Sequence, residues 1–227
     1  MSGRFLLIAT PEAVAVAFGC AVDWLVPRYN IAPSQPIAVV RMGRGRRELA
    51  LVRWGFVPGW ARDPQRFRPV ANARAEGLAD KPAFRGALRY RRCLVPASGW
   101  YQWERAAHGR SRPWLIRPRD GGVVGLAGLW EPWLGADGSE VDGAAMVTLA
   151  AGADIAGIAD RMPAVIPPAA YERWLDVDRT SVAAAADLLR PADPGSLEAV
   201  PVDERVNRAG NDDPDLIPAP GGGAVRP

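Results

Sequence analysis

The residue with the clearest chemical use in this sequence is Glu104, which ends a segment (residues 100–104) of alternating aromatic and polar side chains. Such alternation predicts a half-buried strand, so the carboxylate stands at the polar end of the strand, beside aromatic rings. A carboxylate in that setting can act as a proton donor or acceptor. A solvated glutamate at the end of a strand would give the same pattern, so the rest of the sequence has to decide between the two.

Arginine supplies nearly all of the positive charge in this sequence. Lys81 is the single lysine among 28 basic residues, and the formal net charge is +3. The arginines cluster in residues 41–47, 85–92 and 110–119. The guanidinium fork is suited to phosphate, so clusters interleaved with tryptophan predict a groove for nucleic acid. Solvated hairpin loops are an equally good interpretation of such runs.

Cysteine and histidine are scarce, which limits the chemistry available. Cys20 and Cys93 lie among apolar neighbours and are expected to be free thiols, as in a reducing cytoplasm. His108, the one histidine, falls in a predicted turn, so we expect neither a zinc site nor a serine–histidine–aspartate triad, and no cofactor. No apolar run approaches about 18 residues, and no secretory leader is recognisable, so no membrane association is expected.

The elements that must position these groups are mostly short strands. In the first half, Thr10 and Pro11 mark a helix start, with Thr10 as N-cap and the helix reaching about Gly19. The predicted strands and extended segments are residues 3–8, 28–33, 37–41, 49–54 and 94–95, with a basic hairpin tip at 43–47 and a turn at 96–99.

The second half predicts further strands, at residues 114–117, 123–130 and 144–149, followed by a helical turn at 154–160 and helices at 168–175 and 181–189. With 227 residues, 48% hydrophobic and 23% charged, one globular domain is expected. We place it at residues 1–218 and expect the glycine-rich residues 219–227 to form a flexible tail.

Seven short motifs, in order along almost the whole chain, resemble those of the SOS-response-associated peptidase family, the abasic-site processing proteins. Each motif is weak alone, and together they are a strong signal. They are Met1-x-Gly3-Arg4-Phe5, Arg28-Tyr29-Asn30-Ile31-Ala32-Pro33, Trp54-Gly55-Phe56-Val57-Pro58, Asn72-Ala73-Arg74-Ala75-Glu76, Trp100-Tyr101-x-Trp103-Glu104, Asp160-Arg161-Met162-Pro163 and Val206-Asn207.

This resemblance implies an α+β single domain with a mainly antiparallel, barrel-like core, flanking helices and a basic groove for single-stranded DNA. In the family, removal of Met1 exposes a cysteine that crosslinks to the aldehyde of an abasic site. Its amine condenses to an imine and its thiol then closes a thiazolidine ring, which makes the adduct durable. The family's glutamate matches Glu104 and assists ring opening of the sugar. Its asparagine matches Asn72 and orients the sugar.

The sequence departs from the family pattern at two of the reacting positions. Ser2 stands in place of the cysteine, and Ala159 in place of a histidine that stabilises or deprotonates the sugar. A serine hydroxyl is a weaker nucleophile than a thiol at neutral pH, and an alanine transfers no proton. Directed inactivation and a natural paralogue that has dropped the covalent step both fit these departures.

Three functions therefore stay open from the sequence. The first is a DNA-binding pseudoenzyme, which binds single strands carrying abasic sites or junctions without forming a lasting covalent bond. The second is a weakened, lyase-like enzyme that forms a transient Schiff base through the α-amine of Ser2. The third is a hydrolase with Ser2 as an N-terminal nucleophile. We expect a monomer acting on the nucleoid.

The resemblance also implies residues that contact DNA. Arg4, Arg74 and Arg161 are assigned to phosphates near the reacting sugar, and salt bridges within their own motifs are the alternative. Motif alignment adds three positions that line the groove, namely Pro33, Trp60 and Thr148. For Trp60, packing in the core explains the residue equally well.

Overall fold

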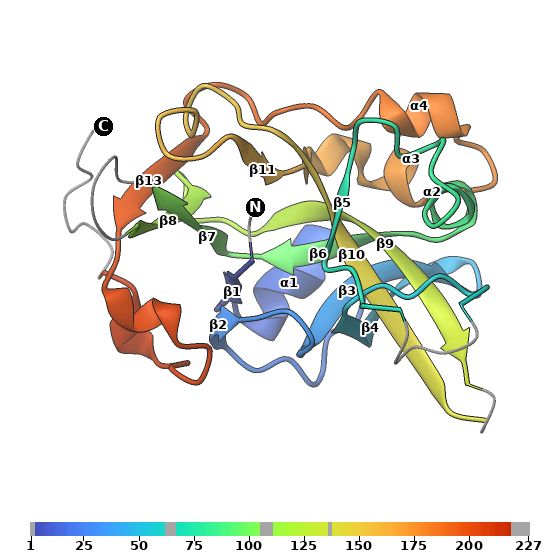
Figure 1. Cartoon of the computed structure of the whole chain (residues 1–227), viewed down its shortest axis with the longest axis horizontal. Helices are drawn as coiled ribbons and strands as arrows, with labels where there is room; N and C mark the ends of the chain where they lie inside the picture. The colour runs from blue at the N-terminus through green and yellow to red at the C-terminus, as the bar shows by residue number, and fades with distance from the viewer. Residues whose placement is uncertain (1–2, 62–66, 105–110, 136–137, 219–227) are drawn as a thin grey trace.

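The computed structural model describes residues 3–61, 67–104, 111–135 and 138–218 (Figure 1). Within these residues, the strands are β1 (Phe5–Leu7), β2 (Arg28–Ile31), β3 (Pro36–Gly43), β4 (Arg46–Trp54), β5 (Asn72–Arg74), β6 (Arg92–Ala97), β7 (Gly99–Glu104), β8 (Arg112–Pro118), β9 (Val124–Leu134), β10 (Glu140–Ala150), β11 (Arg161–Pro163), β12 (Val165–Ile166) and β13 (Leu197–Pro201). The α-helices are α1 (Pro11–Phe18), α2 (Arg85–Tyr90), α3 (Tyr171–Leu175) and α4 (Val182–Ala186), and three 3₁₀ turns lie at Pro168–Ala170, Glu204–Asn207 and Pro214–Leu216.

The centre of the fold is a closed ring of strands. In the described part of the chain, β10 pairs with β4, β4 with β3, β3 with β6, β6 with β9, and β9 with β10 again. All of these pairings are antiparallel except that of β4 with β10. Gly143 makes the parallel contact possible, because a Cβ there would come within 2.5 Å of the Gly55 carbonyl oxygen. The expected barrel-like, mainly antiparallel core is confirmed.

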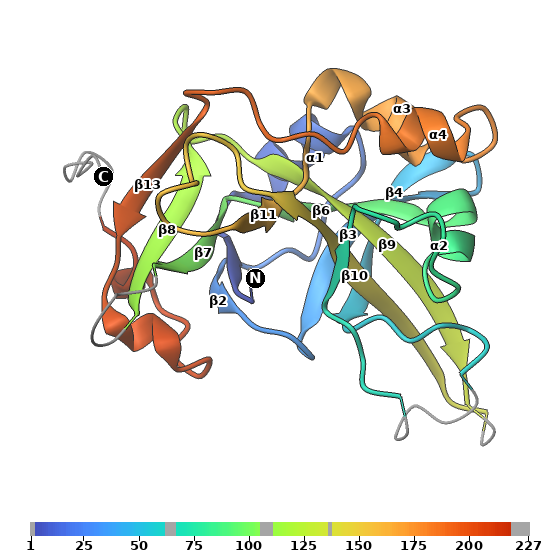
Figure 2. The same ribbon diagram turned by 45° about the horizontal axis from the view of Figure 1, so that its top comes forward.

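A second sheet carries Glu104 at the end of β7, and its strand β1 begins directly after Arg4. Its strand order in the described residues is β13-β8-β7-β1-β2. Figures 1 and 2 show this sheet at one end of the molecule and α2, α3 and α4 gathered at the other, while the paired strands β9 and β10 extend from the centre to the lower right. Since β6 leads directly into β7, the chain itself joins the barrel to the second sheet.

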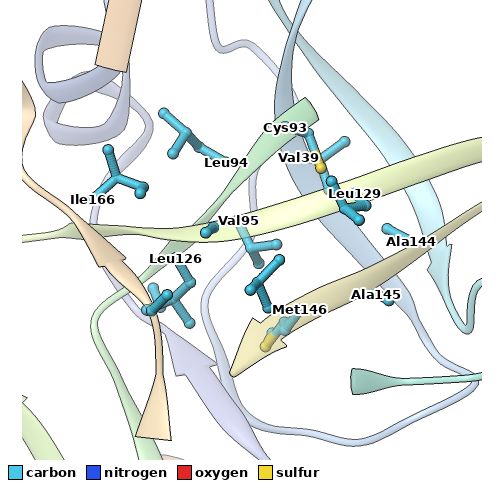
Figure 3. Packing of buried hydrophobic residues seen from close by; sticks show 14 of the residues in the cluster. Val39, Cys93, Leu94, Val95, Leu126, Leu129, Ala144, Ala145, Met146 and Ile166 are labelled. Carbon is cyan, nitrogen blue, oxygen red and sulfur yellow. The ribbon is translucent and has the colours of Figure 1, made fainter. Parts of the chain in front are cut away.

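The core is built from the inward side chains of the barrel strands. Figure 3 shows Val39, Leu94, Leu126, Leu129 and Met146 gathered from β3, β6, β9 and β10. Each of these side chains is almost completely buried. The β-branched and apolar residues of these segments favour strands. Burial runs without alternation along all of β6 and through much of β9 and β10, so these strands are covered on both faces.

The capping residues in the sequence predicted the position of α1 correctly. The Thr10 side chain accepts a hydrogen bond from the Ala13 N–H at 3.2 Å, Pro11 opens the helix, and Gly19 ends it with φ of 63°. The predicted hairpin is also confirmed as β3 and β4. The helix predicted at 181–189 is confirmed but shorter, as α4 with Ser181 as its N-cap.

The turn predicted at residues 96–99 is wrong. β6 continues through Pro96 and Ala97, and Pro96 lies opposite Gly125 of β9. Proline lacks an N–H, but β6 pairs with β3 only at Leu94, so no partner there needs that donor. The corner is confined to Ser98. At the next position, Gly99, a Cβ would meet the Ile116 carbonyl oxygen at 2.6 Å.

Candidate functional site

A cavity of about 630 Å³ lies where the end of β7 meets β11 and the turn before it. It is open to solvent and more polar than a core cavity, since charged side chains line it from three segments that are far apart in the sequence. Its lining residues are Arg74, Gln102, Trp103, Glu104, Ser111 and residues 156–161. Four residues predicted from the sequence, Arg74, Glu104, Ala159 and Arg161, therefore line one cavity.

Glu104 is fixed at the cavity by the indole of a neighbouring strand. The Trp114 Nε1–H donates to Glu104 Oε2 at 2.9 Å, and Glu104 lies opposite Arg112 at the end of the β7–β8 ladder. Trp114 is buried and Glu104 half-buried. One carboxylate oxygen is thus held by the protein, which orients the group toward the cavity.

The floor of the cavity joins the second sheet to β11. Gln102, which is buried, donates from Nε2 to the Arg161 carbonyl oxygen at 2.8 Å. At the next residue of β7, the Trp103 Nε1–H donates to Asn207 Oδ1 at 2.7 Å, linking the cavity wall to the C-terminal 3₁₀ turn. These two contacts fix the residues just before Glu104, one to β11 and the other to the C-terminal 3₁₀ turn.

The Arg161 side chain is held by residues outside its own motif. Its guanidinium donates to both carboxylate oxygens of Glu76, at 2.8 and 3.1 Å, and to the Thr148 carbonyl oxygen at 2.6 Å. The hydrogen bonds from Arg161 lower the pKa of the Glu76 carboxyl. Arg161 therefore forms a salt bridge, as the alternative from the sequence stated, but its partner Glu76 lies in a different motif. The assignment of Arg161 to phosphate stays a prediction.

Asn72 and Arg74 both lie on β5, which pairs in parallel with β10 so that Asn72 is opposite Met146 and Arg74 opposite Thr148. Residues two apart in a strand project to the same face. Arg74 is exposed, whereas the Asn72 side-chain oxygen is buried. Thr148 is fully buried behind Arg161, and its hydroxyl donates to the Ala73 carbonyl oxygen at 3.4 Å.

Arg4 is a structural link in this conformation. Its guanidinium donates to Asn30 Oδ1 at 2.9 Å and to the carbonyl oxygens of Val206 and Asn207 at 2.6 and 3.1 Å. Burial lowers the pKa of Arg4, and the electrostatic interaction with Tyr101 acts in the opposite direction. The Arg4 carbonyl accepts from the Tyr101 N–H, so the chain enters β1 beside β7. The assignment of Arg4 to phosphate is untested.

Trp60 and Pro33 lie on the surface, apart from the residues that line the cavity. Trp60 is 62% exposed, and its ring meets Phe67 edge-on with centroids 5.9 Å apart, so the alternative interpretation, packing in the core, is wrong. Its loop is anchored by the Trp133 Nε1–H, which donates to the Ala61 carbonyl. Pro33 is exposed in a turn where Ser34 adopts φ of 74°. Ser2 and His108 lie outside the described residues.

The arginine clusters are only partly a surface feature. Arg92 is 1% exposed and donates to backbone carbonyls, including those of Trp174 and Leu88. Arg91 pairs with both oxygens of Glu131. Two arginines of the cluster at residues 85–92 therefore serve the interior and the barrel wall, and the groove for nucleic acid stays a prediction.

Sequence reasoning did not single out Gln102, Trp114 or Asn207 as parts of the site. Two signals could have drawn attention, namely a polar residue, Gln102, between aromatic neighbours in a strand, and the place of Asn207 in a family motif. No cluster of His, Cys, Asp and Glu suited to a metal ion occurs in the described residues, and both cysteines are free thiols, as expected. Of the helices that the structure describes, none is both long and apolar enough to cross a membrane.

Comparisons with solved structures agree with the barrel. A protein from Bacteroides thetaiotaomicron superposes with a TM-score of 0.84 at 24% identity, over 94% of this chain and 97% of the other, which shows the shared fold. A protein from Bordetella bronchiseptica gives a TM-score of 0.76 at 27% identity, covering 88% of this chain and 99% of the other.

Comparisons with sequences extend the similarity to named relatives. Abasic site processing protein YoqW of Bacillus subtilis (strain 168) is 32% identical over 223 residues, which is 96% of this chain and 99% of the relative. Abasic site processing protein HMCES of Gallus gallus is 29% identical over 222 residues, covering 84% of this chain and 66% of the relative. The family model described as SOS response associated peptidase (SRAP) matches residues 1–209, so the chain belongs to that family.

Proposed function

We propose that this protein binds single-stranded DNA at abasic sites, in the cavity beside β7 and β11, and that its durable crosslink to the sugar is lost or weakened. The observation that carries the proposal is the meeting of Arg74, Glu104, Ala159 and Arg161 around one cavity of about 630 Å³. These residues come from three separate family motifs. Their convergence, together with the family membership, supports a retained sugar pocket.

The proposed roles follow from how each side chain is held. Arg74 is exposed at the cavity and is suited to a phosphate on its rim. Glu104 has one oxygen engaged by Trp114, which favours proton exchange with the sugar through the other. Asn72, on the same face of β5 as Arg74, is assigned to orient the sugar. Thr148 acts by positioning Arg161, since it is buried behind it.

The remaining DNA-binding assignments concern the rim. Trp60 offers an exposed indole face on which a base can stack, and Pro33 adds a second apolar surface. Arg4 would reach a phosphate only by exchanging one of its present acceptors or by using its remaining N–H groups. We expect the protein to do this as a monomer on nucleoid DNA, in the cytoplasm.

The chemistry at position 2 sets how long the complex lasts. The α-amine of Ser2 adds to the aldehyde carbon of the opened sugar, and water leaves with the carbonyl oxygen as the C=N bond forms. A cysteine thiol would then add to that bond and close the ring. The serine hydroxyl is a poorer nucleophile at neutral pH, and Ala159 supplies no proton, so the imine reverts to amine and aldehyde.

A transient Schiff base is therefore the second candidate activity, and the retained geometry of Glu104 favours it. Borohydride reduces an imine to a stable amine, so trapping separates this activity from simple binding. Lys81, the one other primary amine, is exposed in the turn before α2. Mass spectrometry of the trapped product should place the DNA on Ser2. An adduct on Lys81, or retained Met1, would show that the proposed geometry is wrong.

Two measurements test binding and catalysis separately. Fluorescence anisotropy should show micromolar or tighter binding to abasic single strands, lost steeply as salt rises, because several phosphates are contacted. Glu104→Gln should leave that affinity largely unchanged while lowering the rate of borohydride trapping, since it removes only the proton-exchanging group. No binding at low salt would refute the proposed function.

A further inference from the structure

Glu76 pairs with the guanidinium of Arg161, the group assigned above to a DNA phosphate. Its two carboxylate oxygens accept from two different nitrogens of Arg161, Oε2 from Nη2 at 2.8 Å and Oε1 from Nη1 at 3.1 Å. This is the forked geometry in which a guanidinium binds a phosphate as readily as a carboxylate. The Glu76 side chain is 57% exposed and that of Arg161 18%, so solvent reaches the acid more freely than the base.

The backbone holds the two partners in place before any ligand arrives. The Thr148 carbonyl oxygen accepts both the Ala75 N–H at 2.8 Å and Arg161 Nη2 at 2.6 Å. A turn follows Glu76, with Gly77 at φ of 68° and the Leu78 N–H donating to the Ala75 carbonyl at 3.1 Å. The carboxylate is therefore presented to the guanidinium at little cost in chain entropy.

Glu76 is surrounded by positive charge, as a bound anion would be. Arg161 contacts it directly, and Arg74 on β5 lies close enough for its charge to act on the carboxyl. The hydrogen bonds from Arg161, followed by the charges of Arg161 and Arg74, lower the pKa of Glu76, so the carboxyl is ionised at neutral pH. An anion thus sits between two arginines, both of which line the cavity.

We propose that Glu76 competes with the DNA backbone for Arg161. In the free protein Glu76 pairs with the Arg161 guanidinium, and a phosphodiester of the bound strand displaces Glu76 from it. The proposal rests on the proposed function, because Arg161 must meet a phosphate of the bound strand. Glu76 then lowers the affinity for single-stranded DNA in general, so that strands making few other contacts are released. Arg161 stays ordered through the Thr148 carbonyl during the exchange.

The test uses Glu76→Gln, which keeps the shape of the side chain and removes its charge. An exposed ion pair of this kind is typically worth about 0.2–1 kcal/mol, so binding of a single-stranded oligonucleotide should tighten by about 1.4- to 5-fold at low salt. The slope of log K against log salt should change by less than about 0.7, the value for one phosphate contact on a single strand, because Arg161 contacts the same phosphate in both complexes. Anisotropy titrations at several salt concentrations measure both quantities.

Two controls isolate the pair. Glu172→Gln makes the same change of net charge at an exposed position on α3 that does not line this cavity. It should leave the affinity and the salt slope unchanged. In an Arg161→Gln background, the gain from Glu76→Gln should vanish, as a double-mutant cycle requires of two residues that act together. Thermal melts of all variants verify folding, and Glu76→Ala serves as a second charge-removing variant.

The outcomes separate this inference from the proposed function. Affinity that is unchanged or weaker in both folded Glu76 variants overturns the inference, because Glu76 would then be positioning Arg161 for DNA. Tightening that persists in the Arg161→Gln background also overturns it. If neither the wild type nor the variants bind single-stranded DNA at low salt, the proposed function fails and this inference with it.

Discussion

Replacing Arg92 tests whether the basic run at residues 85–92 serves the fold or the DNA. The Arg92 guanidinium donates to the carbonyl oxygens of Trp174, at 2.5 Å, and Leu88, at 2.9 Å, in the interior, and to those of Asp176 and Thr180 at its edge. Arg92→Met retains most of the apolar stem and removes all of these donors. Each buried carbonyl left without a donor costs about 1–3 kcal/mol, so the two interior acceptors alone predict about 2–6 kcal/mol of destabilisation.

For a chain of this length, 1 kcal/mol shifts the melting temperature by about 2–4 °C, so Arg92→Met should melt at least about 4 °C below the wild type. The matched control is Arg89→Met, three residues earlier and exposed, where a change within about 0.5 kcal/mol is expected. Calorimetry gives both values, and anisotropy below the melting temperature should show unaltered DNA affinity for Arg92→Met. Equal melting temperatures for the two variants, or a loss of DNA binding by folded Arg92→Met, would refute the structural role.

Three further predictions concern the reacting groups, the rim and the acid stability. Ser2→Cys should restore a heat-resistant crosslink, seen on denaturing gels. Adding Ala159→His should speed its formation by about 100- to 10,000-fold without much change in final yield, since general acid–base catalysis changes the rate. A variant that binds abasic DNA but forms no adduct would contradict this prediction. Trp60→Ala should weaken single-strand binding by about 1–3 kcal/mol in anisotropy, and Trp60→Phe by less, if a base stacks there. Burial acts to raise the pKa of Asp212, but hydrogen bonds from Arg28 and from two backbone N–H groups lower it overall. Its contribution to stability is therefore present above the ordinary carboxyl pKa and lost as pH falls through the lowered one, and Asp212→Asn should remove that part of the pH dependence of unfolding.

The elements that the sequence predicted well are those whose signals are local. The cap of α1 needs only Thr10, Pro11 and Gly19, which lie within one short segment. The β3–β4 hairpin likewise follows from two apolar runs around a glycine-containing tip. In these places, turn and capping chemistry decides the structure without reference to the rest of the chain.

The elements that were missed depend on distant partners. β13 is stable as a strand because it pairs with β8, where Leu197 lies opposite Pro118. Arg92 is buried because acceptors more than 80 residues away, at Trp174, Asp176 and Thr180, surround its guanidinium. A run of basic residues predicts a solvated surface when only near neighbours are considered, so neither feature could be recognised before the fold was known.

The candidate site could be predicted only as a set of residues. The family motifs named Arg74, Glu104 and Arg161, but their meeting around one cavity depends on β5, β7 and β11 being brought together by the barrel and the second sheet. The partners that hold them, Trp114 for Glu104 and Glu76 for Arg161, follow from the register of the strands and the turn after β5.

The central claim is that the protein holds abasic single-stranded DNA in this cavity without a lasting bond. The most direct measurement compares the same mixture of wild-type protein and abasic oligonucleotide in two ways, by anisotropy under native conditions and by a denaturing gel after heating. We predict salt-sensitive binding in the first and, without borohydride, no protein–DNA band in the second. A heat-stable band from the wild type, or no native binding at low salt, would contradict the account.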